Sequence, residues 1–131
     1  MTRKIASIVF FLTALVIGLG AFGHDSNVRR LAGEFAKFPG LDPGLMLIVF
    51  AVWHFCSGCM LVFGAICLWS WWRLRAGVRA ALFAPAAIGV FYFAAGIASV
   101  AYTGRPFFWL FTVLGTLLLV SGPLIGGKAA D

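Results

Sequence analysis

Charged residues are scarce in this chain of 131 residues, and acidic residues are the scarcest. Lysine and arginine together number 10 and aspartate and glutamate 4, so charged residues make up 11% of the sequence. A soluble domain carries about 25% charged residues. Hydrophobic residues make up 63% of the chain. The composition therefore excludes a soluble globular domain and is typical of an integral membrane protein.

The apolar residues fall into four long runs, at residues 5–23, 43–72, 78–102 and 106–125. A helix needs about 20 apolar residues to cross a hydrocarbon core about 30 Å thick. The runs predict an all-α fold, a four-transmembrane-helix bundle forming a single integral membrane domain over residues 1–131. The first run exceeds the roughly 7–15 apolar residues of a secretory signal, so we expect a retained helix.

A short interfacial helix is expected between the first two spans. Its apolar positions are spaced as on one helix face: Val28, Leu31, Phe35 and Phe38. Asp25 or Ser26 could cap it, and the apolar face would lie on the outer membrane surface. Asp42 followed by Pro43 predicts the start of the second span. Pro85 is expected to kink the third.

The net charge of +6 does not indicate nucleic-acid binding, because the basic residues flank the helices and form no patch interleaved with aromatic residues. The positions of these basic residues are better explained as signals of membrane topology. With the N-terminus inside, six basic residues lie on one side and four on the other: Arg3, Lys4, Arg73, Arg75, Arg79 and Lys128 against Arg29, Arg30, Lys37 and Arg105. The positive-inside rule then places both termini in the cytoplasm, and we expect a bacterial cytoplasmic membrane.

The three cysteines all fall in the second span, so they do not describe a disulfide framework. Cys56 and Cys59 lie far from a helix N-terminus that could activate a thiolate, and we expect buried, inert side chains. At about 100° per residue, His54 and Cys56 point to opposite sides of the helix, which argues against a shared metal ion. Haem is disfavoured because His24 is expected at a membrane boundary and His54 about 16 Å inside its helix.

His54 is expected near the middle of the membrane, where ionisable residues are costly and often functional. Its helix face continues through mostly small residues: Ser57, Gly58, Leu61 and Ala65. We therefore expect His54 to point into the bundle at a close helix crossing. Two interpretations stay open. His54 is either a neutral side chain bonded to Tyr92, Ser99 or a backbone carbonyl, or a residue that handles protons or contacts a ligand.

A second group of candidates is expected at the outer membrane face. It comprises His24, Asp25, Arg29, Arg30, Tyr102 and Arg105. These residues form either a solvated rim in contact with lipid headgroups, or a binding mouth for an anionic headgroup or a partner protein.

The spacing His54-x-x-x-Gly58-x-x-Leu61-x-x-Gly64 resembles the second helix of the DoxX-like family of small four-helix membrane proteins. In that family an acidic residue precedes Gly, Leu and Gly at the same offsets, where this chain has His54. The plan of one helix, a long outer segment and three further helices is also similar. The resemblance implies a four-helix membrane fold. The family's functions range from subunits linked to quinone or thiosulfate oxidation to oxidative-stress partners and receptor chaperones.

From these patterns we expect a non-enzymatic accessory or scaffold subunit of a membrane complex, without a cofactor. Its partners would be the lipid bilayer and either another membrane protein or a second copy of the chain. The alternative is a quinone-linked redox subunit in which His54 hydrogen-bonds a quinone carbonyl. A small transporter is the weakest interpretation, because the apolar runs contain no carboxylate. The sequence contains no Ser-His-Asp or HExxH arrangement that would indicate an enzyme. We leave the question of enzymatic activity open.

Overall fold

The computed structural model describes residues 2–125, and every regular element in that range is helical. The longer helices are α1 (Arg3–Ser26), α2 (Val28–Phe35), α3 (Pro43–Arg75), α4 (Phe83–Thr103) and α5 (Trp109–Ile125), with short 3-10 turns η1 (Arg79–Leu82) and η2 (Pro106–Phe108). In this range four helical segments are long and apolar enough to cross a membrane, which fits an integral membrane protein. The predicted all-α, four-helix bundle is confirmed.

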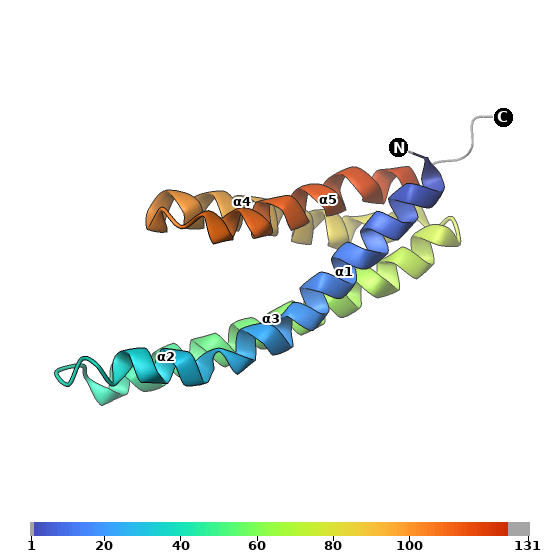
Figure 1. Cartoon of the computed structure of the whole chain (residues 1–131). Helices are drawn as coiled ribbons and strands as arrows, with labels where there is room; N and C mark the ends of the chain where they lie inside the picture. The colour runs from blue at the N-terminus through green and yellow to red at the C-terminus, as the bar shows by residue number, and fades with distance from the viewer. Residues whose placement is uncertain (1, 126–131) are drawn as a thin grey trace.

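The first hairpin consists of α1, α2 and α3. α2 runs on from α1 almost without a break, so that Arg3–Phe35 forms one helical stretch of 33 residues beside the 33 residues of α3 (Figure 1). Asp42 begins α3 as predicted, because its carboxylate accepts hydrogen bonds from the backbone N–H groups of Gly44 and Leu45, at 3.1 and 3.3 Å.

The tightest contact in the first hairpin lies where Gly18 of α1 meets Gly64 of α3. A Cβ atom added to Gly64 would overlap the Cα atom of Gly18 and lie 2.6 Å from its nitrogen. Glycine is therefore required at Gly64, and the glycine-rich exit of the first span allows the close approach expected of it. Further along, the Trp71 indole donates hydrogen bonds to the carbonyl and hydroxyl oxygens of Ser7.

The second hairpin consists of η1, α4, η2 and α5. Gly104 ends α4 with a φ of 66°, the left-handed conformation that glycine adopts without strain. α4 and α5 then pack along their small residues. A Cβ atom at Gly96 would overlap the Thr112 side chain, and one at Gly115 would lie 2.5 Å from the carbonyl oxygen of Gly89. The small residues of α4 thus serve mainly its contact with α5.

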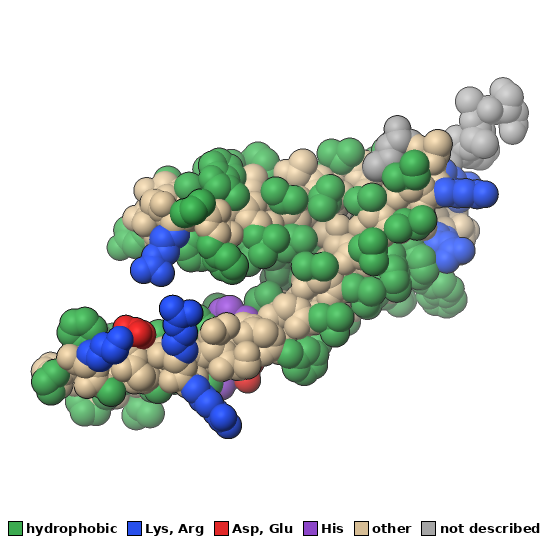
Figure 2. All heavy atoms as spheres, viewed as in Figure 1, with side chains coloured by type: hydrophobic (Ala, Val, Ile, Leu, Met, Phe, Trp, Pro, Cys, Tyr) green, Lys and Arg blue, Asp and Glu red, His purple; other side chains and the backbone are tan. Residues whose placement is uncertain are grey.

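Within residues 2–125 the two hairpins pack together from one end, which we call the closed end, to about the middle of α4, where Phe63 contacts Tyr92. At the closed end Phe10, Leu74, Leu118 and Ile125 are fully buried, and a Cβ atom added to Gly122 would lie 3.4 Å from the Phe10 ring. From the closed end the hairpins diverge, so that the turns at the other end stand apart (Figure 1). The space between them, called the opening below, is visible as a hollow in Figure 2.

One expectation about local structure is wrong, the cap of the short helix, and the interfacial placement and the Pro85 kink stay predictions. The stripe containing Phe35 packs against α3, with the Phe35 and Phe50 rings 5.8 Å apart, so α2 extends the hairpin and no interfacial placement is shown. α2 follows Asn27 without a side-chain cap from Asp25 or Ser26. Pro85 is the third residue of α4, close to the point where the 3-10 turn η1 passes into the α-helix. Lys128, used in the topology argument, lies outside the described residues.

Candidate functional site

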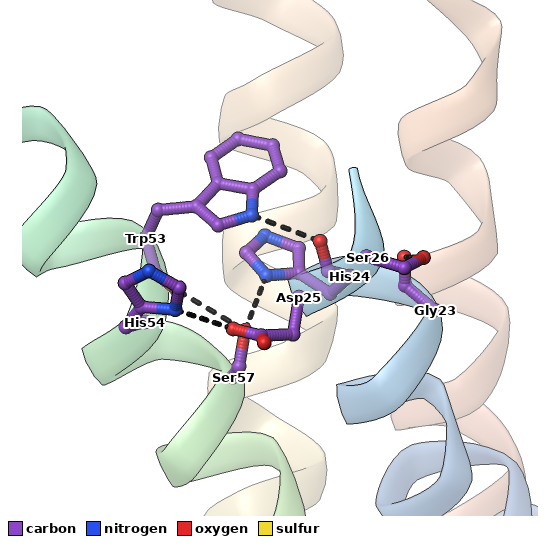
Figure 3. Close-up of polar contacts among 7 residues, drawn as sticks. All are labelled: Gly23, His24, Asp25, Ser26, Trp53, His54 and Ser57. Atoms are coloured by element: carbon purple, nitrogen blue, oxygen red, sulfur yellow. Dashed lines mark hydrogen bonds and ion pairs between the residues drawn. The ribbon is translucent and has the colours of Figure 1, made fainter. Parts of the chain in front are cut away.

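The candidate site lies where the last turn of α1 meets the middle of α3. α1 and α3 run antiparallel, so residue numbers increase along α1 as they decrease along α3. Ser7 meets Trp71, Gly18 meets Gly64, and His24 meets Ser57. This register gathers His24, Asp25, Trp53, His54 and Ser57 into one polar cluster (Figure 3).

His24 is held by three contacts with α3. Its Nδ1 atom lies 2.9 Å from the Ser57 hydroxyl oxygen, and its backbone carbonyl accepts a 2.8 Å hydrogen bond from the Trp53 indole N–H. Its ring stacks on the Trp53 ring, with centroids 4.1 Å apart and planes 16° from parallel. The single Ser57 proton goes to the Trp53 carbonyl, at 3.1 Å. We therefore assign the His24 proton to Nδ1.

His54 pairs with Asp25. The His54 Nδ1 atom lies 2.6 Å from the Asp25 Oδ1 atom, and the two side chains are 55% and 47% exposed. An ionised carboxylate only accepts hydrogen bonds, so Nδ1 carries a proton. The Nε2 atom makes no hydrogen bond with the residues that the structure describes. The pair thus presents one unengaged imidazole nitrogen that can accept a proton, or donate one when the ring is charged.

The expected surroundings of His54 are wrong in two respects. The side chain does not point into the bundle and is bonded to Asp25 instead of Tyr92, Ser99 or a carbonyl. The helix crossing also lies elsewhere, because a Cβ atom at Gly58 would meet nothing within 4 Å, unlike one at Gly64. The physical reason is that α1 continues past Gly23 and places Asp25 beside His54.

The structure brings together some of the predicted site residues and separates others. His24, Asp25, His54 and Ser57 join in one cluster. Tyr92 lies buried on α4 among Phe63, Phe91 and Phe111, with ring centroids 5.9 to 6.4 Å away. Arg29 and Arg30 are exposed on α2, and Tyr102 and Arg105 are exposed at the far end of the second hairpin. The six outer-rim candidates therefore lie on two separate hairpins.

Trp53 belongs to the cluster and was not among the candidates. Its indole both stacks on His24 and bonds the His24 carbonyl. The sequence does contain one signal, because Trp53 and Ser57 are spaced i, i+4 and so share a helix face. That face has a polar partner only because helix α1 extends through His24.

The cysteines and histidines differ from their expected placement. Cys67 is buried, but Cys56 is exposed and Cys59 half-buried, so uniform burial is wrong. The expected mismatch in height between the histidines is also wrong, because His24 stacks on Trp53, the neighbour of His54. Within residues 2–125, no three His, Cys, Asp or Glu side chains gather as a possible metal site.

Comparison with protein-family models, with curated proteins and with solved structures found no match to this chain.

Proposed function

We propose that this protein is a non-enzymatic accessory or scaffold subunit of a membrane complex, whose opening receives a transmembrane helix of another membrane protein. The observation that carries the proposal is the lack of cover on α3. In the most apolar window of α3 only 6% of the residues are buried, against 33% to 39% in the other three spans. A central helix of a closed bundle would be covered on several sides.

One face of α3 passes from packed to uncovered. Phe63 lies on that face and contacts α4, with its ring centroid 5.9 Å from Phe91 and 6.4 Å from Tyr92. Cys59, Cys56 and Val52 follow on the same face at offsets of four, seven and eleven residues, spacings that return to one side of a helix. Cys59 is half-buried, whereas Cys56 and Val52 are exposed. The packed face therefore continues into the opening.

α4 supplies the facing wall. Ala95, Ser99 and Tyr102 follow Tyr92 at offsets of three, seven and ten residues, so they continue the face that meets Phe63. Ala95 and Ser99 are half-buried and Tyr102 is exposed. Small side chains on such a wall allow another helix to approach closely.

The polar groups at the opening favour a protein over lipid tails. Figure 2 shows a basic side chain of the second hairpin, and a basic side chain and histidine of the first, beside the hollow. Lipid tails cannot hydrogen-bond these groups, whereas a protein helix can present partners for them. The resemblance to the DoxX-like family also supports a subunit role. The proposal includes a cytoplasmic membrane with both termini inside, on the positive-inside argument.

The proposal predicts a cross-link from one face of α3. A photoreactive benzophenone amino acid at Val52 faces the opening, whereas the same group at Leu61 lies nine residues, or about 180°, around the helix. Both native side chains are about half exposed, at 53% and 47%. After irradiation of intact membranes, we expect a discrete adduct to a second membrane protein from Val52 and little from Leu61.

Two results would count against a distinct partner. Equal adducts from both positions would show undirected collision. An adduct with the mass of two copies, proven by two differently tagged chains, would replace the foreign helix with a second copy of this protein.

The unengaged Nε2 atom of His54 favours a quinone-linked redox subunit as a second candidate function. Asp25 bonds the opposite nitrogen and so fixes the ring, and Nε2 would donate to a quinone carbonyl when it carries a proton.

This second function predicts quinone retained after purification in mild detergent. After extraction and chromatography, the amount of bound quinone in His54→Ala should be about tenfold lower than in the wild type. This corresponds to a loss of about 1.4 kcal/mol in binding free energy. His24→Gln is the matched control and should retain it, because glutamine can still bond Ser57. Quinone absent from the wild type, or kept by His54→Ala, would remove this candidate.

A further inference from the structure

A groove at the closed end has a chemistry that the opening does not share. It has a volume of about 720 Å³ and lies between the first turns of α1, the end of α3 and the last residue of α5. Its lining residues are Arg3, Lys4, Ser7, Ile8, Phe11, Trp71, Arg75 and Ile125. This volume falls within the roughly 300–1,000 Å³ typical of small-ligand sites.

The charge of the groove is of one sign. Arg3, Lys4 and Arg75 line it, and no acidic residue does. The acidic residues within residues 2–125 are Asp25, Glu34 and Asp42, and all three belong to the far half of the first hairpin. Two guanidinium groups and an ammonium group at one mouth suit a phosphate, which guanidinium groups bind in a bidentate manner.

The polarity of the groove changes with depth. Along α1, Lys4 is followed by Ile8 and then Phe11, and along α3 the step from Arg75 to Trp71 is again one turn. The cations therefore stand at the helix ends, and the apolar side chains lie toward the middle of the bundle. A ligand that matches both parts has an anionic head and an apolar tail.

The aromatic wall of the groove is held in place before any ligand arrives. The Trp71 indole donates to the carbonyl oxygen of Ser7 at 3.0 Å and to its hydroxyl at 2.9 Å. Its ring lies 4.7 Å from the Phe11 ring, and the Arg75 guanidinium lies 4.7 Å from the Trp71 ring centroid. A preformed wall lowers the entropy cost of binding.

We propose that this groove binds one anionic phospholipid, with the phosphate on Arg3, Lys4 and Arg75 and an acyl chain against Ile8, Phe11 and Trp71. Basic pockets between transmembrane helices are a recognised site for anionic lipid headgroups. The charge argues against the following segment of the chain as occupant. The side chains of residues 126–131 include one lysine and one aspartate, so these side chains together bring no net charge to the three cations.

The test compares two lipids with the same acyl chains on the purified full chain in detergent. Native mass spectrometry with phosphatidylglycerol and with zwitterionic phosphatidylcholine should show about a tenfold preference for phosphatidylglycerol. The triple variant Arg3→Gln, Lys4→Gln, Arg75→Gln should lose it. The matched control Arg29→Gln, Arg30→Gln, Lys37→Gln removes the same charge from the other end of the hairpin and should keep it.

Three further arms separate the possible occupants. Ile8→Trp keeps every cation and fills the apolar part, so it should also lose the lipid. Inorganic phosphate at millimolar concentration should not displace phosphatidylglycerol, and full displacement would reduce the groove to a phosphate site and overturn the proposal. Equal loss in both triple variants would overturn it as well. So would a lipid preference that emerges only when the chain is cut after Ile125, since residues 126–131 would then be the occupant.

Discussion

Gly64→Ala is expected to destabilise the protein by about 3 kcal/mol, at the upper end of the usual cost of overpacking. The added methyl group would overlap the Cα atom of Gly18 and lie 2.6 Å from its nitrogen and 3.1 Å from the carbonyl oxygen of Ala14. All three are backbone atoms, so no rotamer change relieves the overlap. The two helices must separate, and the polar cluster between His24 and Ser57 should loosen with them.

Two alanine substitutions provide matched controls. At Gly58 a Cβ atom meets nothing within 4 Å, so Gly58→Ala should be neutral or stabilising by up to about 1 kcal/mol through helix propensity. At Gly18 the nearest atom is the Cα of Gly64 at 3.5 Å, an ordinary contact, so Gly18→Ala should be mild. The free energy of unfolding is measured in mixed micelles by titration with SDS, followed by far-UV circular dichroism. If all three variants unfold alike, the crossing is not where the structure places it.

Phe10→Ala is expected to cost about 3–5 kcal/mol, the range for truncating a buried phenylalanine. The Phe10 side chain is fully buried, and a Cβ atom added to Gly122 of α5 would lie 3.4 Å from its ring, at the joint between the hairpins. In a membrane the loss is mainly of van der Waals contact, because lipid tails are as apolar as the core. Phe22→Ala on the same helix is the control. Phe22 is 63% exposed, so its truncation should cost under about 1 kcal/mol.

A second readout links Phe10 to the proposed function. Spin labels at Leu47 and Tyr102, both exposed near the far ends of the two hairpins, report the width of the opening. The labels are introduced after the native cysteines have been replaced by alanine. Phe10→Ala should broaden their distance distribution, while Phe22→Ala leaves it unchanged. An unchanged distribution in Phe10→Ala would show that the Phe10 contact does not set the angle between the hairpins.

Much of the fold could be predicted from the sequence. The four spans at residues 5–23, 43–72, 78–102 and 106–125 correspond to the observed helices, although α1 and α3 each extend three residues further at the C-terminal end. Run length and composition are local properties, and a backbone in a membrane must satisfy its hydrogen bonds within a helix. The cap at Asp42 was predictable for the same reason, because it acts on its own neighbours.

The candidate site was predictable only as separate residues. His24, Asp25, His54 and Ser57 were all identified, but on different grounds and as parts of two groups. The small residues on the face of His54 predict partners inside the bundle, and a first helix that ends at Gly23 would not bring Asp25 beside His54. Glycine disfavours a helix by about 1 kcal/mol. In the structure the packing against α3 outweighs that cost, and the helix continues to Ser26.

The sequence by itself determined that the chain is helical, that four segments can span a membrane, and where their polar ends lie. These follow from the length and periodicity of apolar runs. Only the tertiary structure decided the register of α1 on α3, the pairing of His54 with Asp25, the divergence of the hairpins and the basic groove at the closed end. Each depends on which surfaces fit at contacts such as Gly18 with Gly64. Apolar helix faces of similar composition do not encode that fit in their pattern.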